Sequence, residues 1–329
     1  MYDDIKTFLR EMPLTHYLAG GFWSTKEPTL VFFCGREQIQ ALVAGVRGGV
    51  GYEVSLEKDN DAPPLASGQA NLGTGRGSRT LSRKLTLRYR LRRNVRHLFV
   101  IDPEKKDRFF GVDTLERMHQ KDVRAALEEM HENPQQVFGE WPDYAPFRWA
   151  IVNRAINLAI ETNPRIEEPL LMFGISDEIC ASLESWSQTQ GASIVAILPL
   201  PVAVLSWCIH TLATKDRDSL VVVATDQGAV GAAFRRRNLI YISQEESASD
   251  AFSVLEGESD NLGLEQPVSY LWALSHTEDR RTIPEDIVII DEENIEKISG
   301  ASLSLQEGHG KKIKHDRPLA HLLNWLVTQ

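Results

Sequence analysis

Two glycine-containing segments of this chain have residue types that could bind a phosphate. Residues 72–78 carry glycines at positions 73, 75 and 77, and successive backbone amides in such a run can cradle an anion. A P-loop also needs a Lys followed by Ser or Thr, and this run lacks that pair. Gly310, Lys311 and Lys312 fail the same test, because no Ser or Thr follows the lysines. We therefore predict a flexible surface loop at residues 72–78 and no P-loop in the chain.

A basic stretch is the strongest charge feature of the sequence. Residues 76–97 contain nine Lys or Arg and no acidic residue. Alternation predicts a strand with Arg88, Arg90 and Arg92 on one face and Tyr89 on the other. A solvated face paired with the protein's own carboxylates is the simpler interpretation, and a docking surface for an acidic partner segment or anionic lipid is the alternative. RNA binding is less favoured, because the single interleaved aromatic residue faces away from the arginines.

Side chains that commonly bind metals or perform nucleophilic catalysis form no recognisable pattern. His309, His315 and His321 are six residues apart, which places them on no common helical face and matches no zinc spacing. The three cysteines lie in apolar runs, as buried reduced thiols do. No nucleophile elbow, catalytic triad or paired-carboxylate motif is present. The sequence therefore predicts no metal site and no catalytic residue.

The bulk composition is that of an ordinary globular protein. Of the 329 residues, 42% are hydrophobic and 25% are charged, which allows one large domain or two with ample core. The net charge of −10 argues against a general nucleic-acid binder. The first residues lack the apolar segment of a signal peptide, and no apolar run is long enough for a membrane-spanning helix. We expect a cytoplasmic protein whose link to a membrane would go through a partner.

The hydrophobic pattern of the first half predicts strands and two helices. Strands are expected within residues 28–45, 50–56, 85–92 and 98–101. The period then changes over residues 114–130, where Val123, Ala126, Leu127 and Met130 fall on one face of an amphipathic helix. Residues 145–161 suggest a second helix.

The second half has an α/β rhythm. Buried strands are expected at residues 169–173, 193–198 and 287–290, with an antiparallel meander at 220–224, 229–234 and 239–243. Helices are expected after Ser176, from Pro201 and over residues 318–326. The acidic stretch 245–260 is predicted to be solvated, as either a loop or a helix.

Residues 30–43 look like the first phosphate-loop hairpin of an actin-like ATPase. In that superfamily a strand ends in Asp-x-Gly, turns, and returns as a strand that often carries a Lys. Here Gly35 stands at the glycine, Phe33 at the aspartate and Gln40 at the lysine. Residues 167–243 follow the element order of PilM of type IV pilus assembly and of the GspL-type domains of type II secretion, which they resemble. Residues 111–137 look like the small subdomain inserted in the first lobe of PilM.

The resemblance implies an α/β chain with two actin-like lobes of the ribonuclease H-like ATPase fold. Residues 1–165 would form the first lobe, with the inserted subdomain at about 102–140, and residues 166–329 the second. Asp226, Gln227 and Gly228 match a second Asp-x-Gly, but Asp and Gly are also common in tight hairpin turns. The length of the returning strand places the family aspartate at Val223 and puts Asp226 in the turn itself.

The resemblance also implies that nucleotide chemistry has been lost. Phosphoryl transfer depends on positioning and charge neutralisation, and Mg²⁺ needs carboxylate ligands. Phe33 and Val223 supply none, and residues 290–293 are anionic where the family has a glycine turn against adenosine. Gly35, Asp226 and Gly228 would then be vestigial cofactor-binding positions, and no cofactor is expected. ATP with Mg²⁺ stays open as the alternative.

The function that the resemblance implies is a non-catalytic scaffold of a type IV pilus or type II secretion-like assembly. It would sit in the cytoplasm at the inner membrane and bind the cytoplasmic tail of a bitopic, PilN-like partner. We expect the groove beside the insert around Val123 and Leu127, with Arg88, Arg90 and Arg92 adding charge attraction. An active ATPase or sugar-kinase-like enzyme is the competing hypothesis, and it would need Asp226 and Gly228 as the second phosphate loop. A self-assembling filament former, and thus a homo-oligomer, is the third.

Overall fold

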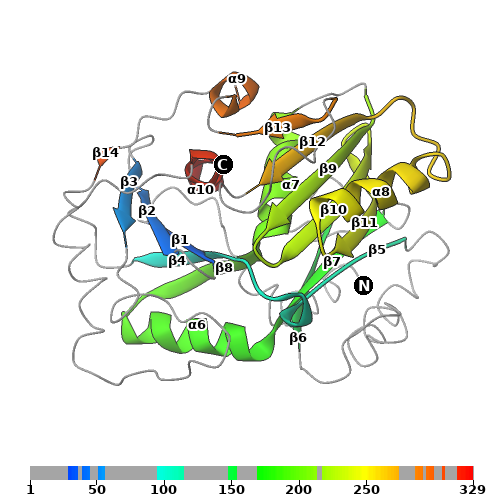
Figure 1. Ribbon diagram of the computed structural model, residues 1–329. Coiled ribbons are helices and arrows are strands. Elements are labelled where there is room, and N and C mark those ends of the chain that lie inside the picture. The colour runs from blue at the N-terminus through cyan, green and yellow to red at the C-terminus, as the bar shows by residue number, and fades with distance from the viewer. Residues whose placement is uncertain are drawn as a thin grey trace, which may run out of the picture.

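The computed structural model describes eleven ranges of the chain: 29–35, 39–44, 51–55, 95–114, 147–153, 169–212, 217–273, 286–291, 294–299, 306–307 and 317–328. The predicted features at residues 72–78 and 85–92, and the predicted helix after residue 114, lie outside these ranges. So do Arg88, Arg90, Arg92, Val123 and Leu127. The strands of the described part form three sheets (Figure 1). None of its helices is long and apolar enough to span a membrane.

The first sheet has the order β14-β3-β2-β1-β4-β8. Its strands are β1 (Thr29–Cys34), β2 (Ile39–Ala44), β3 (Gly51–Ser55), β4 (Arg96–Ile101), β8 (Ser193–Pro199) and β14 (Gln306–Glu307). The central strand β1 pairs antiparallel with β2 and parallel with β4. All six of its residues are buried, because helices cover both faces of the sheet. Those helices are α6 (Asp177–Thr189) on one side and α10 (Arg317–Thr328) on the other (Figure 1).

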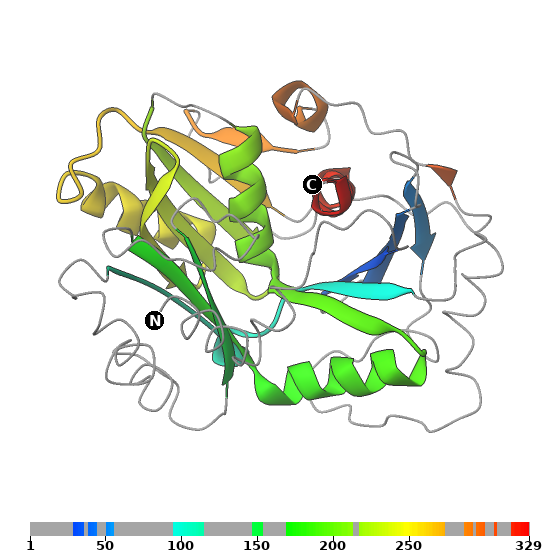
Figure 2. The ribbon, with the colours of Figure 1, turned by 180° about the vertical axis from the view of Figure 1, so that it is seen from behind.

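The second sheet has the order β11-β10-β9-β12-β13. Its strands are β9 (Ser219–Thr225), β10 (Gly228–Arg235), β11 (Asn238–Glu245), β12 (Val268–Ala273) and β13 (Val288–Ile290). Alternate residues of β9 face two separate cores, Val221 and Val223 one of them and Val222 the other. Helices α7 (Leu200–Thr211) and α8 (Ala248–Ser259) cover the two faces (Figure 2). The predicted meander is confirmed, and the acidic stretch is largely the helix α8.

Helix α7 connects the two larger sheets. It follows β8 of the first sheet directly and packs on β9 of the second. Every residue from Leu200 to Ile209 is buried, which is the pattern of a helix enclosed on all sides. Pro201 lies in its first turn, where proline removes no helical hydrogen bond, so the predicted start is confirmed. A short helix, α9 (Ile295–Ser299), and a 3₁₀ turn, η1 (Lys105–Asp107), complete the described elements.

The third sheet is small, with the order β5-β7-β6. Its strands are β5 (Arg108–Thr114), β6 (Phe147–Asn153) and β7 (Pro169–Ser176), all antiparallel to their neighbours. The helix predicted at residues 145–161 is therefore wrong over β6. Aromatic and β-branched residues fill that segment, and pairing with β7 extends it.

The sheets do not divide where the sequence predicted. The small sheet spans residues 108–176, beyond the expected insert at 102–140, and β8 and β14 return to the first sheet from the region assigned to the second lobe. A boundary at residues 165 and 166 therefore does not separate the two larger sheets. The reason is that β8 pairs parallel with β4, and parallel neighbours require a long crossover. The small sheet and α6 form that crossover.

Candidate functional site

The two hairpins that the sequence singled out meet at the segment joining β4 to β5. Asp102, the first residue after β4, donates its backbone N–H to the carbonyl of Cys34 at 3.1 Å, one residue before Gly35. Arg108, at the start of β5, donates from Nη2 to the carbonyl of Gln227 at 3.0 Å. Residues 102–108 thus link the end of the first hairpin's leading strand to the turn of the second hairpin. We take this junction as the candidate site.

A buried ion pair occupies the junction. Arg108 Nη1 lies 3.2 Å from Asp102 Oδ1, and each side chain is only 1% exposed. Burial raises the pKa of the Asp102 carboxyl to about 6, while the Arg108 charge opposes the shift. Burial also lowers the pKa of Arg108, and the Asp102 charge opposes that shift. Each group therefore depends on the other for its charged form.

The pair is not fully hydrogen-bonded. Asp102 Oδ2 and Arg108 Nε are both buried, and neither has a hydrogen-bond partner at ordinary geometry within the described part of the chain. The Thr225 hydroxyl still acts on Asp102 and opposes the rise of its pKa. A buried charge is costly unless its partners are complete, so this junction is energetically sensitive to change. An exposed ion pair beside it, Lys105 to Glu246 at 3.0 Å, also connects η1 to the second lobe but contributes little.

Hydrogen bonds within the turn of the second hairpin occupy its backbone groups. Asp226 and Gln227 form a two-residue turn between β9 and β10, as the sequence predicted. The backbone N–H of Gln227 donates to Thr225 Oγ1 at 3.1 Å, and that hydroxyl donates to the carbonyl of Gly228 at 3.2 Å. A phosphate-binding loop has to direct such amides at its ligand. Here the Gln227 amide is already bound to a side chain. Asp226 is exposed, and its charge contributes to raising the pKa of Asp102.

The two positions assigned to lost carboxylates lie in the core. Phe33 and Val223 are both 0% exposed. Phe33 is opposite Gln40 across the hairpin and opposite Val100 on β4, while Val223 is opposite Val230. Within the described ranges, no group of three His, Cys, Asp or Glu side chains could hold a metal ion. The residues at this junction do not fit a Mg²⁺–nucleotide.

The anionic segment after β13 has a local structural role. The backbone N–H of Asp291 donates to Asn294 Oδ1 at 2.9 Å, and that of Asn294 donates to Asp291 Oδ1 at 3.2 Å. The carbonyl of Asp291 accepts from Ile295, the first residue of α9. This reciprocal pattern caps a helix start, so Asp291 is accounted for by local structure.

The structure brings some of the predicted site residues together. Gly35 and Gly228 lie at the two hairpins that residues 102–108 connect, and Asp226 lies in the turn beside them. The sequence did not single out Asp102 or Arg108. A polar residue directly after a buried strand was a usable signal for Asp102. Arg108 carried none, because a buried arginine cannot be recognised without its partner.

Gly228 is required by backbone geometry. Its φ is +99°, and a Cβ atom there would lie 2.6 Å from the carbonyl oxygen of Glu245. We expect Gly228→Ala to lower the free energy of unfolding by about 2 kcal/mol or more, measured by urea denaturation. Gly257→Ala is the matched control, because this helical glycine has open space around it and should gain about 0.5–1 kcal/mol. Equal stability of the wild type and Gly228→Ala would contradict the requirement for glycine at this position.

Comparisons with known proteins agree with the architecture. No protein family model matches the sequence, and no curated protein matches it. The structure is similar to the PilM–PilN type IV pilus biogenesis complex, with a TM-score of 0.53 and 11% identity over 92% of this chain and 97% of the other. Two weaker similarities are to a Bacteroides thetaiotaomicron protein with an actin-like ATPase fold (TM-score 0.44, 11% identity, 92% and 98% covered) and to the cytoplasmic domain of EpsL from Vibrio cholerae (TM-score 0.43, 9% identity, 91% and 94% covered).

These findings define the class of fold. The chain has the two-lobed actin-like fold with an inserted small sheet, as the sequence predicted. Its likeness to PilM extends over nearly the whole of both chains. At 11% identity, that likeness concerns the fold.

Proposed function

We propose that this protein is a non-catalytic scaffold of a type IV pilus or type II secretion-like assembly. In this role it binds a short tail of an inner-membrane partner and stays in the cytoplasm, peripheral to that membrane. The similar structure is of a complex, PilM with PilN, which supports a partner-binding role. The proposal needs no cofactor.

The buried Asp102–Arg108 pair is the observation that carries the non-catalytic part of the proposal. In a phosphoryl-transfer enzyme, charged groups and backbone amides at such a junction must face the substrate and its metal. Here the Arg108 charge is directed at Asp102 and at the carbonyl of Gln227. In the proposed scaffold, these protein groups join the lobes at the junction and no nucleotide is required there.

Mg-ATP binding is the direct test of this part. We expect isothermal titration to give no heat up to millimolar Mg-ATP, and the melting temperature to stay unchanged. A ligand present at 100 times its Kd would stabilise the native state by about 2.7 kcal/mol, which is easily detected. A clear stabilisation that Asp226→Ala abolishes would instead make Asp226 a ligand residue and support the competing enzyme.

Tail docking is proposed beside the inserted small sheet. Its outer strands β5 and β6 each pair on one side only within the described residues, and an unpaired strand edge can accept an extended peptide. The basic strand with Arg88, Arg90 and Arg92 and the helix with Val123 and Leu127 belong to the proposal, although they lie outside the described residues.

Charge reversal tests the docking surface. We expect the triple variant Arg88→Glu, Arg90→Glu, Arg92→Glu to weaken binding of a labelled peptide of the PilN-like cytoplasmic tail roughly tenfold or more, and less so at high salt. Lys106→Glu is the control for a charge reversal outside the predicted stripe, since the Lys106 side chain is 57% exposed. Equal binding by wild type and triple variant would remove the arginine stripe from the proposal.

A further inference from the structure

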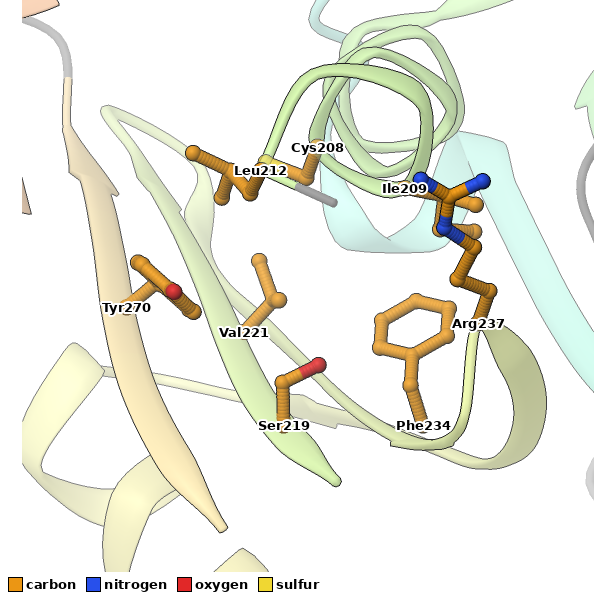
Figure 3. A pocket seen from close by; sticks show the side chains of 8 residues that line it. All are labelled: Cys208, Ile209, Leu212, Ser219, Val221, Phe234, Arg237 and Tyr270. Atoms are coloured by element: carbon orange, nitrogen blue, oxygen red, sulfur yellow. The ribbon is translucent and has the colours of Figure 1, made fainter. Parts of the chain in front are cut away.

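A small pocket lies on the second lobe, at the end of the sheet opposite the candidate site. Strand β9 begins at this pocket with Ser219 and ends at the candidate site with Thr225, about 20 Å away at ordinary strand rise. The pocket is shallow and partly open, and the empty space of about 310 Å³ at it includes open solvent. It is bounded by the end of α7 and strands β9, β10 and β12, with eight lining residues (Figure 3): Cys208, Ile209, Leu212, Ser219, Val221, Phe234, Arg237 and Tyr270.

The lining combines an apolar wall with hydrogen-bond donors. Val221 and Phe234 form one side, and Ile209 and Leu212 face them from α7 (Figure 3). Ser219 and Tyr270 contribute hydroxyls, and Arg237 contributes a guanidinium. None of the eight lining residues is a carboxylate. Such a lining favours a ligand with an anionic group next to a short apolar part.

Arg237 supplies the positive charge at the rim of the pocket. Arg237 lowers the pKa of His210 in addition to the effect of burial, and no carboxylate is among the causes of that shift. Arg237 Nε is buried and makes no hydrogen bond within the described residues. Burial raises the pKa of the Tyr270 hydroxyl, and the Arg217 charge opposes that shift. The pocket is therefore electropositive and has a donor to spare.

The turn that carries Arg237 is strained. Arg236 and Arg237 join β10 to β11 in a two-residue hairpin, with φ of 48° and 71°. Two-residue hairpins with positive φ at both positions favour Asn-Gly, and other side chains cost about 1–2 kcal/mol each there. Folding alone gains nothing from arginine at these positions. Strain of this kind is characteristic of sites where a side chain is needed for something else.

We propose that this pocket binds the oxyanion group of a small molecule, a phosphate or a carboxylate attached to a short apolar part. Arg237 pairs with the oxyanion, the hydroxyls of Ser219 and Tyr270 add hydrogen bonds, and Val221 and Phe234 contact the apolar part. This site is separate from the junction at Asp102, and its strands belong to a different sheet from β5 and β6. It does not depend on the proposed function.

Titration of the full-length protein with inorganic phosphate, phenyl phosphate and benzoate tests the pocket. We expect isothermal titration to detect binding, with a lower Kd for phenyl phosphate than for inorganic phosphate. The Kd values of phenyl phosphate and benzoate then show whether phosphate or carboxylate is preferred. Arg237→Met should weaken the binding roughly tenfold or more. Arg235→Gln is the matched control, because Arg235 is in the same hairpin but donates to the carbonyl of Leu262 beside α8.

Arg237→Gly separates the binding role from a folding role. Glycine accepts a φ of 71° without strain, so this variant should melt at or above the wild-type temperature while losing the binding. Retention of binding in both Arg237 variants would overturn the proposal. The proposal would also be overturned if Arg235→Gln weakened anion binding as much as Arg237→Met does, or if the wild type bound none of the three anions.

Discussion

Arg108→Met is expected to lower the free energy of unfolding by about 3–5 kcal/mol at neutral pH, the largest single effect in this protein. The substitution keeps most of the side-chain volume but leaves the Asp102 carboxylate buried without its counter-charge. It also removes the hydrogen bond to the carbonyl of Gln227, which joins the lobes. Urea denaturation followed by circular dichroism measures the change. The loss should shrink as the pH falls, because a protonated Asp102 needs no counter-charge.

Two further variants separate the ion pair from general packing. The double variant Asp102→Leu, Arg108→Met should recover much of the lost stability, because replacing both charges by apolar groups removes the uncompensated one. Lys105→Met breaks the exposed pair with Glu246 and should cost less than about 1 kcal/mol. If Arg108→Met lowers the free energy of unfolding no more than Lys105→Met does, the buried ion pair is not the structural link between the lobes.

Acidification is expected to destabilise the protein through His97. This histidine is fully buried between the aromatic rings of Phe32, Phe99 and Trp186, and its Nδ1 lies 3.0 Å from Ser187 Oγ. Burial lowers its pKa from 6.5 to about 3. Below pH 6.5, His97 is therefore protonated in the unfolded chain but stays neutral in the native state. The His97 contribution is complete above pH 6.5 and falls as the pH drops, by about 2 kcal/mol at pH 5.

His97→Phe isolates this contribution. Phenylalanine suits the aromatic surroundings and does not titrate, so the stability difference between wild type and variant should change by about 2 kcal/mol between pH 7.5 and pH 5. Loss of the bond to Ser187 adds a cost that is the same at every pH. Protonation of Asp102 stabilises the native state as the pH falls, because its pKa is raised there. This effect is present in wild type and variant alike, so it cancels in the difference between them. A pH-independent difference would mean that His97 is protonated in the native protein.

Local sequence patterns predicted much of the second lobe. The meander β9–β11 follows from its apolar strands and a short polar turn. Helices α7 and α10 were predicted from the apolar segment that follows a proline in each case. Strand β12, between β9 and β13, was not predicted, and β6 was predicted as a helix. In both cases pairing with a neighbouring strand decides the conformation, and that pairing cannot be recognised from the hydrophobic pattern of the segment alone.

The fold class followed from a resemblance that extends over most of the chain. Within single segments, the sequence by itself determined the apolar residues at Phe33 and Val223 and the turn at Asp226. Each of these is a property of one segment and its own residue types. Only the tertiary structure decided that β8 returns to the first sheet and that Arg108 pairs with Asp102 across the inserted turn. It also placed Arg237 over a pocket. These depend on contacts between segments. Asp102 and Arg108 are only six residues apart, but each also bonds to a distant segment, Asp102 to Cys34 and Arg108 to Gln227.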